Sequence, residues 1–209
     1  MDWFDGALAD HDVLRSLYPP ARERAWRKDI GHLDEMARAL IAASPMVLLA
    51  TSAANGRCDA SPRGGQPGFV TVLDDQHLAI PDATGNRRLD SLTNIIDSGR
   101  AGLLFLIPGR STTLRVNGRA CVTAERECLE QIAAVGKPPI TAIVVNVEEV
   151  YVHCPKAFVR SRLWQPDSWP EEQQLPAPAE VTLAHLRDPD LTLEAINRLE
   201  RDSLKNRLA

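Results

Sequence analysis

Between Pro45 and Cys154 the chain alternates between short apolar segments and turn signals, and this alternation limits the possible folds more than any other feature. Asn55-Gly56 predicts a hairpin in which residues 57–61 form the return strand. Short antiparallel strands favour a closed or nearly closed β-barrel, because closure removes exposed strand edges. The other predicted strands, of which the last is rich in β-branched residues, are 46–52, 69–73, 77–81, 101–108 and 141–154.

Three connecting segments are less regular. Residues 62–68 are rich in glycine and proline and predict a loop, and residues 74–76 predict the turn of a second hairpin. Residues 112–124 predict either a strand pair or one bent strand, with Asn117-Gly118 as a turn or a bulge. Because five or six strands leave little lumen, a ligand would bind on the outer rim of the barrel or between two barrels.

Helical periodicity occurs before, within and after the strand region. Residues 8–43 are predicted to be helical, and residues 125–135 predict a short helix. Residues 89–99 predict another short helix that ends at Gly99. The apolar face of the first region would contain Leu33, Met36 and Leu40, and that of the helix 89–99 would contain Leu89, Leu92, Ile95 and Ile96.

The C-terminal part of the chain has two sections. Residues 165–189 contain five of the fifteen prolines and predict an extended connection, and residues 191–208 predict an amphipathic helix. That helix would pack either on its own barrel or against a second subunit. We therefore expect an N-terminal helical segment, 1–44, that packs on a barrel domain, 45–164, followed by the connection and helix, 165–209.

Composition excludes some classes of protein and suggests a location. The formal net charge of −4 argues against general binding to nucleic acid or to acidic membranes, and no apolar run is long enough to span a bilayer. The four cysteines form no CxxC pair and the histidines lack metal-ligand spacing, so we expect no metal. The N-terminus has no signal-peptide pattern, and we expect a cytoplasmic protein with reduced thiols.

Several motifs, taken in order, resemble the FMN-binding split-barrel superfamily, and within it the pyridoxamine 5′-phosphate oxidase-related proteins. The resemblance runs from about residue 40 to residue 165. It implies a six-stranded, mainly β split barrel with flanking helices, which forms a homodimer with two FMN sites at the subunit interface. The motifs are DASPRGG (59–65), PGFV (67–70), LAIPDATGNRRLDSLTNI (78–95), LLFLIPG (103–109), TLRVNGRA (113–120) and HCPKAFVRSRLW (153–164).

The resemblance assigns the FMN phosphate to the segment before the predicted helix 89–99. The oxidases carry an adjacent Arg-Lys pair in this loop, and the matching residues are Arg87 and Arg88, preceded by Asn86. Arginine suits a phosphate because its planar fork donates two parallel hydrogen bonds, and a helix N-terminus adds unpaired N–H groups. The alternative is that the two arginines form surface ion pairs with acids such as Asp82 or Asp90.

Two strand ends are similar to the segments that run beside the flavin in the family. The first is Ser61-Pro62-Arg63, in which Arg63 would reach the phosphate or the pyrimidine end of the ring. The alternative for Arg63 is a solvated turn, and Asp59 would orient Arg63 or Arg115 or simply lie on the surface. The second is Ile80-Pro81-Asp82, where the oxidases place main-chain contacts to the ring.

Three further residues are assigned to the flavin by the same resemblance. Thr113 occupies the position of a glutamine that reaches the flavin from the partner subunit in the oxidases, and Arg115 lies on the same strand face, where it would replace that contact or form a cross-strand salt bridge. Trp164 would cover the flavin face, fill the dimer seam or pack in the core. His153 and Cys154 would point to opposite faces of a strand, which argues against a catalytic dyad.

The sequence departs from the oxidases after residue 164. Their C-terminal segment of Trp, Arg and His, which holds the substrate, has no counterpart here. We therefore expect a flavin-dependent oxidoreductase that acts on an unidentified small molecule, with no residue assigned as its general acid or base. The alternatives are a non-catalytic flavin carrier or sensor, or a relative that binds heme or deazaflavin.

Overall fold

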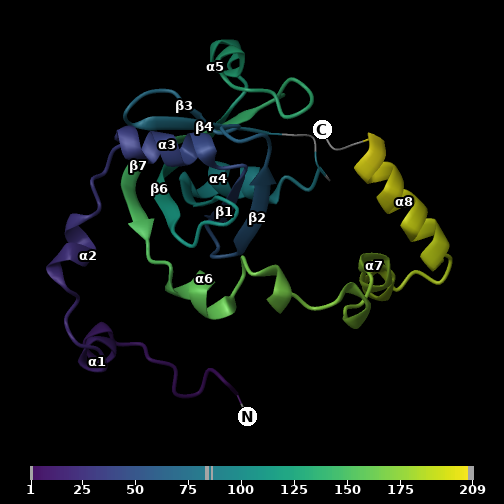
Figure 1. The fold of residues 1–209 in the computed structure, drawn as a ribbon, viewed down its shortest axis with the longest axis horizontal. Helices are drawn as coiled ribbons and strands as arrows, with labels where there is room; N and C mark the ends of the chain where they lie inside the picture. Colours follow the sequence, from purple (N-terminus) through teal and green to yellow (C-terminus); the bar gives the residue numbers. More distant parts are fainter. Residues whose placement is uncertain (1, 83–84, 86, 207–209) are drawn as a thin grey trace.

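The computed structural model describes residues 2–82, 85 and 87–206. Its centre is one antiparallel sheet in the order β2-β1-β5-β6-β7-β4-β3, which curls into a split barrel (Figure 1). The resemblance implied six strands, and the seventh is the two-residue β3. The strands are β1 (Met46–Ser52), β2 (Cys58–Gly64), β3 (Thr71–Val72), β4 (His77–Pro81), β5 (Arg100–Leu106), β6 (Thr113–Thr123) and β7 (Ala142–His153).

Strand β2 is longer than the sequence predicted. The predicted loop 62–68 is wrong for its first three residues, because Pro62 to Gly64 continue the ladder with β1 up to the pair Gly64–Met46. Proline fits here because β2 is an edge strand and needs no N–H donor on its outer side. The extension places Arg63 within a strand, so its side-chain direction is fixed by the sheet.

Strand β6 is a single bent strand with a bulge at Asn117-Gly118. This confirms the second of the two predicted alternatives, a bent strand rather than a strand pair. A Cβ atom on Gly118 would collide with the backbone oxygen of Asn146 on β7. The glycine therefore permits a close approach of the two longest strands.

The core fills the barrel and extends beneath two helices, α3 (Glu35–Ala43) and α4 (Asp90–Ser98). Helix α3 buries Ala37 and Ile41, whereas Met36, predicted to face the core, is exposed. Leu33 and Leu40 do pack on or in the core as predicted.

Helix α4 buries fewer apolar side chains than predicted. Leu92 and Ile95 are buried as expected, but Leu89 and Ile96 are exposed. Leu89 precedes the helix in a left-handed conformation, so it does not follow the helical face. A polar pair takes the remaining buried face, in which the Asn94 amide donates to the Thr51 hydroxyl at 3.1 Å.

The N-terminal region is less helical than predicted. Two short helices, α1 (His11–Ser16) and α2 (Glu23–Arg27), replace one helical stretch, because Pro19-Pro20 interrupts it. Every residue from 2 to 28 is exposed. Lys28 marks the point where the chain reaches the barrel, since its ammonium donates to the carbonyl of Val152 at 2.9 Å.

The C-terminal region corrects a second prediction. Residues 165–189 are not an extended connection, because they contain two short 3₁₀ turns, η1 (Pro166–Ser168) and η2 (Glu172–Gln174), and the helix α7 (Pro178–Leu186). The predicted amphipathic helix is present as α8 (Leu193–Asn206). It packs on α7 rather than on the barrel sheet, and Figure 1 shows this helix pair to one side of the barrel.

Two shorter helices complete the fold. The predicted helix 125–135 is only α5 (Arg126–Gln131), which lies over a small second apolar cluster around Ile132. Helix α6 (Lys156–Ser161) follows β7. None of the helices in the described ranges is both long enough and apolar enough to cross a membrane.

Candidate functional site

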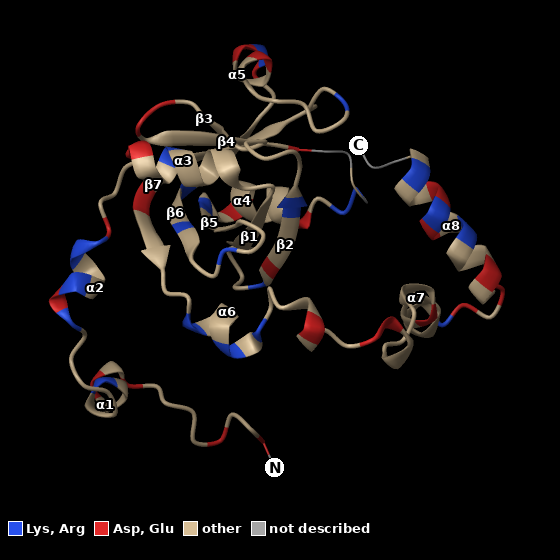
Figure 2. Ribbon diagram, in the orientation of Figure 1, with Lys and Arg blue, Asp and Glu red and all other residues tan. Residues whose placement is uncertain are grey.

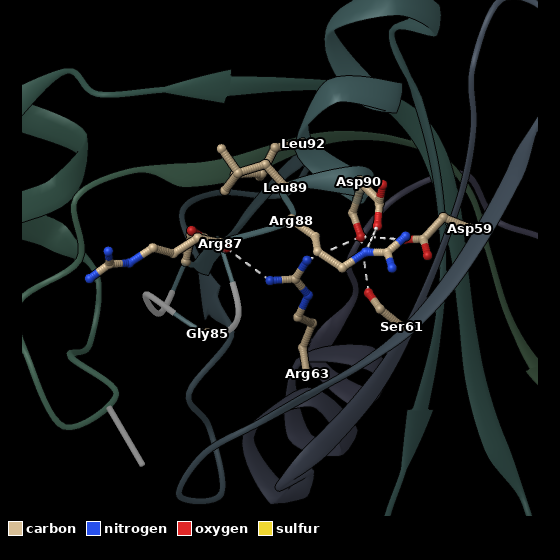
Figure 3. A pocket seen from close by; sticks show the side chains of 11 residues that line it. Asp59, Ser61, Arg63, Gly85, Arg87, Arg88, Leu89, Asp90 and Leu92 are labelled. Atoms are coloured by element: carbon tan, nitrogen blue, oxygen red, sulfur yellow. Dashed lines mark hydrogen bonds and ion pairs between the residues drawn. The ribbon is translucent and has the colours of Figure 1, made fainter. Parts of the chain in front are cut away.

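A pocket of about 340 Å³ lies at the split of the barrel, where the end of β2, the segment after β4 and the start of α4 meet (Figure 3). Three arginines, three aspartates and two serines line most of it. They are Arg63, Arg87, Arg88, Asp59, Asp82, Asp90, Ser61 and Ser91. Five of these eight were predicted as cofactor-binding residues from the sequence, so residues that are up to 27 positions apart in the chain converge on one site.

The alternation of strand β2 explains one wall of the pocket. Asp59, Ser61 and Arg63 are successive odd positions of the strand and share its inner face. Pro62 lies on the opposite, exposed face and does not line the pocket. Of the Ser61-Pro62-Arg63 segment, the structure therefore brings only Ser61 and Arg63 to the site.

Arg63 lies at the centre of the site. Its guanidinium donates to the Asp82 carboxylate at 2.9 Å and to the Ser91 hydroxyl at 3.1 Å, and its side chain is 22% exposed. The ion pair joins β2 to the end of β4, which are not neighbours in the sheet. The Nε atom of Arg63 is buried and has no hydrogen-bond partner among the described residues. Such a donor is costly to leave unpaired, so it marks a place for an acceptor.

Ser91 connects the acids and the arginine. Its hydroxyl donates to Asp59 at 2.6 Å and lies 3.0 Å from the Ser61 hydroxyl and 3.1 Å from an Arg63 nitrogen. A serine hydroxyl has one donor and two acceptor positions, so these three contacts use its full capacity. This buried network fixes Arg63 from one side while Asp82 fixes it from the other.

The segment before α4 has an unusual backbone. Gly85, Arg87 and Leu89 have φ values of 46°, 61° and 60°, which lie in the left-handed region. Arginine and leucine rarely adopt this region, and such strain concentrates at binding sites. Leu89 supplies no side-chain cap to α4, so the first N–H groups of the helix remain available to an anion beside the pocket.

Arg88 makes the surface ion pair that the sequence left as an alternative. Its Nε donates to Asp90 at 2.7 Å, and Arg57 donates to the same carboxylate at 3.0 Å. The hydrogen bond from Arg88 lowers the pKa of Asp90, and the charge of Arg57 acts in the same direction. The side chain of Arg88 is 72% exposed, and solvent screens an ion pair at such a position, so a ligand phosphate can compete for this guanidinium.

Arg87 lines the rim of the pocket from the other side. Figure 3 shows its side chain directed away from Arg63 and Arg88. Asp82, which the alternative paired with Arg87 or Arg88, instead pairs with Arg63. Asn86 lies outside the described residues.

Of the segment Ile80-Pro81-Asp82, only Asp82 lines the pocket. Ile80 and Pro81 are buried at the end of β4, where Pro81 is paired with Ala142. The N–H of Asp82 donates to the carbonyl of Thr141 at 3.0 Å, which directs the carboxylate toward Arg63.

The remaining predicted residues do not line the pocket of the same chain. Thr113 is buried on β6 opposite His153, and Arg115 donates to the Tyr151 hydroxyl at 2.8 Å rather than to an acid. Trp164 stacks on Phe158 with ring centroids 5.8 Å apart and donates to the carbonyl of Arg110. The resemblance placed Thr113 on the partner subunit's side of the flavin, and that assignment stays a prediction.

The residues that line the pocket but were not predicted to bind the cofactor are Asp59, Gly85, Leu89, Asp90, Ser91 and Leu92. Leu89 and Ser91 immediately flank Asp90 at the start of α4, so the position of the Arg87-Arg88 pair at a helix N-terminus was an available signal for both. The role of Ser91 also depends on β2 lying against α4, which no local pattern shows. Within the described ranges no group of three His, Cys, Asp or Glu side chains is arranged to hold a metal ion.

Comparison with known proteins found a matching family model and several solved structures to which the chain is similar. The family model for pyridoxamine 5′-phosphate oxidase matches residues 33–154. Among solved structures, a candidate pyridoxamine 5′-phosphate oxidase from Lactobacillus delbrueckii is 26% identical, with a TM-score of 0.47 over 59% of this chain and 98% of that one. HupZ from Group A Streptococcus is 19% identical, with a TM-score of 0.45 over 57% of this chain and 92% of that one.

A third structure, an FMN-binding protein from Syntrophomonas wolfei, is 13% identical, with a TM-score of 0.42 over 68% of this chain and 97% of that one. No curated protein matches the chain. The family model covers more than half of the chain and spans the described barrel from α3 to the end of β7. The chain therefore belongs to the pyridoxamine 5′-phosphate oxidase family.

Proposed function

We propose that this chain binds flavin mononucleotide in the pocket at the split of the barrel, with the phosphate held by Arg63, Arg87 and Arg88. The observation that supports this most directly is the buried Nε of Arg63, an N–H donor without an acceptor among the described residues. Hydrogen bonds to charged groups contribute about 1.5–3 kcal/mol each, so a phosphate oxygen near this guanidinium would be a strong ligand.

The surroundings of Arg63 suit an anion in two further ways. The uncapped N-terminus of α4 presents backbone N–H groups and a partial positive charge. The network of Asp82 and Ser91 holds the Arg63 guanidinium in place before the ligand arrives, so less side-chain entropy is lost on binding.

The pocket of one chain provides a place for the phosphate rather than for the flat ring. Leu89 and Leu92 are the only apolar side chains among its described lining residues. We therefore propose that the ring is covered by a second copy of the chain, in a homodimer in which Arg115 and Trp164 come from the partner. The exposed apolar side chains of Met46 and Leu48 on β1 suit such an interface.

The bound flavin would supply electron or hydride transfer, and the chain would bind it, orient it and limit access to its ring. We propose an oxidoreductase on this basis, with a small-molecule substrate. The three arginines would also place positive charge beside the cofactor.

Cofactor binding is tested by titrating the purified, ligand-free protein with FMN and following flavin fluorescence and absorbance. We expect wild-type protein to be yellow or to take up FMN, and the Arg87→Ala/Arg88→Ala variant to bind it at least tenfold more weakly. The exposed pair Arg126→Ala/Lys137→Ala, near α5, is the matched control and should bind as wild type does. A wild-type protein that neither carries nor takes up FMN would refute the proposal, and a Soret band or uptake of deazaflavin instead would identify a different cofactor.

Enzymatic function is tested separately on the loaded protein. Anaerobic mixing with reduced nicotinamide should bleach the flavin absorbance at a catalytic rate if the protein is an oxidoreductase that uses this donor. A flavin that stays oxidised with reduced nicotinamide, and with other biological electron donors of lower potential, would favour a carrier or sensor.

A further inference from the structure

We infer that the two terminal arms of this protein join copies of the chain, with the N-terminal arm of one copy lying against the C-terminal arm of a second. The N-terminal arm is residues 2–28, and the C-terminal arm is residues 165–206. The inference rests on the homodimer proposed above but not on the flavin site.

The N-terminal arm is folded but buries nothing in its own chain. Helices α1 and α2 have six and five residues, and every residue from 2 to 28 is exposed. Helices this short are not stable in water by themselves, so they need a surface to pack on. The arm exposes large apolar side chains that would suit such a surface, including Trp26 at 65% and Tyr18 at 66%.

The C-terminal arm also buries few of its side chains. Helices α7 and α8 pack on each other, but Ala179 and Ile196 are the only buried residues in the described part of this arm. Trp169 is 56% exposed and Leu175 is 55% exposed near the start of the arm. Each arm therefore carries unburied aromatic and aliphatic side chains close to the barrel.

The charges of the two arms are complementary where they leave the barrel. Residues 22–28 contain four basic side chains and one acidic, whereas residues 165–180 contain four acidic side chains and none that is basic. Figure 2 shows the basic patch on α2 and the acidic residues before α7. Opposite charges of this kind steer association and fix which surfaces meet.

The two arms of one chain lie too far apart to contact one another. Figure 1 shows α2 on one side of the barrel and α7 and α8 on the other. Lys28 holds the root of the N-terminal arm at the end of β7, through the Val152 carbonyl and the Tyr151 ring, whose centroid lies 4.8 Å from the ammonium. A second copy is then the partner that offers its acidic segment 165–180 to the basic segment 22–28, and a two-fold axis would form both contacts at once.

The test uses charge reversal in the full-length chain. Arg22 and Arg24 form no ion pair among the described residues, and Glu171 and Glu172 are likewise exposed without one. We expect Arg22→Glu/Arg24→Glu and, separately, Glu171→Lys/Glu172→Lys to raise the dimer dissociation constant at least tenfold in analytical ultracentrifugation. The reversal Glu125→Lys/Glu127→Lys on and beside α5, away from both arms, is the control and should change it by less than twofold.

Mixing the two defective variants distinguishes contacts between chains from contacts within one. In the mixed dimer the unchanged basic segment of one copy meets the unchanged acidic segment of the other, and the reversed residues 22 and 24 meet the reversed residues 171 and 172. The mixture should therefore associate at least threefold more tightly than either variant alone. Failure of the mixture to associate more tightly than either variant alone would overturn the inference, as would unchanged association of both variants. A wild-type chain that is monomeric at every concentration measured would refute this inference together with the proposed homodimer. Flavin uptake by that monomer would still support the proposed phosphate site.

Discussion

At the residue scale the site depends on how one arginine is held. Arg63 donates to Asp82 on one side and to the Ser91 hydroxyl on the other, and the Ser91 hydroxyl in turn donates to the Asp59 carboxylate. The pocket contains as many aspartates as arginines, so its net charge is small and its affinity for an anion must come from directed N–H groups. An arginine fork that is already fixed meets this requirement better than a lysine would.

This arrangement predicts a measurable role for Ser91. Ser91→Ala removes the hydroxyl that accepts from Arg63 and donates to Asp59. Ser91 acts on the ligand only through the position of Arg63, so we expect a loss of about 1 kcal/mol in binding, which is about fivefold in FMN affinity. Fluorescence titration of the ligand-free protein measures the change. Ser98→Ala is the matched control, because its hydroxyl donates to the carbonyl of Asn94 and accepts from the backbone N–H of Arg100, and neither of these residues lines the pocket. Equal losses in both variants would mean that α4, rather than Arg63, had been perturbed.

The partly buried thiol of Cys128 on α5 allows a second prediction at this scale. Burial raises the pKa of Cys128, whereas Cys58, Cys121 and Cys154 are exposed. The thiolate is the form that reacts with a thiol reagent. At a given pH a smaller fraction of Cys128 than of the three exposed cysteines is thiolate, so its labelling rate rises at a higher pH than theirs. Labelling with a thiol reagent near pH 8 should therefore give three fast groups and one slow one, and Cys128→Ser should remove the slow phase. Four equal rates would show that α5 does not cover its apolar cluster.

At the element scale the strands were predictable because their signals are local. Strand β1 coincides with its predicted range, and Asn55-Gly56 gives the predicted hairpin, because apolar alternation and turn chemistry act over a few residues. Pro62-Arg63-Gly64 was assigned to a loop, since its composition does not reveal that β2 is an edge strand that tolerates proline. The prolines of residues 165–189 led to the wrong prediction of an extended connection in the same way. Pro178 occupies the first turn of α7, where proline is accepted.

The candidate site was predictable only in part for a related reason. The resemblance to the oxidase-related proteins gave Ser61, Arg63, Arg87 and Arg88, and the position of the last two where a loop enters a helix supported their assignment. The contacts of Arg63 with Asp82 and Ser91 span 19 and 28 residues of sequence and depend on how β2, β4 and α4 meet. No periodicity in one segment encodes such a meeting, so Ser91 was not identified.

The bulge in β6 gives a prediction for the barrel. Gly118→Ala would drive a Cβ atom into the backbone of Asn146 on β7, and because backbone rather than a flexible side chain is struck, we expect a loss of about 3 kcal/mol in the free energy of unfolding. Gly64→Ala is the control, since its new Cβ would lie 3.5 Å from the Pro45 oxygen, an ordinary contact, and should cost less than about 1 kcal/mol. Urea titration followed by tryptophan fluorescence measures both. Similar losses would mean that the close approach of β6 and β7 is absent.

At the scale of the whole molecule, a well-packed barrel carries two arms that bury almost nothing. Local stability follows burial, so in a single chain the barrel strands should open only with global unfolding, whereas the arms should open readily. The N-terminal arm meets the barrel at Val152 near the end of β7, whereas the pocket lies beside Asp82, which is bonded to Thr141 just before β7. Substitutions in residues 22–28 can therefore alter subunit association without removing a residue proposed to hold the phosphate.

Hydrogen exchange at several protein concentrations tests this division. If the arms bind a second copy, the amides of α2 and α7 should gain protection as the concentration rises through the dimer dissociation constant, because binding stabilises only the docked form. The amides of β6 and β7, already protected by the barrel ladder, should exchange at the same rate throughout. The Glu171→Lys/Glu172→Lys variant should lose the concentration dependence in α2 although its substitutions lie in the other arm, because the acidic surface that α2 would meet belongs to the partner. Protection of α2 that is already high in dilute solution would instead mean that the arm folds onto its own chain.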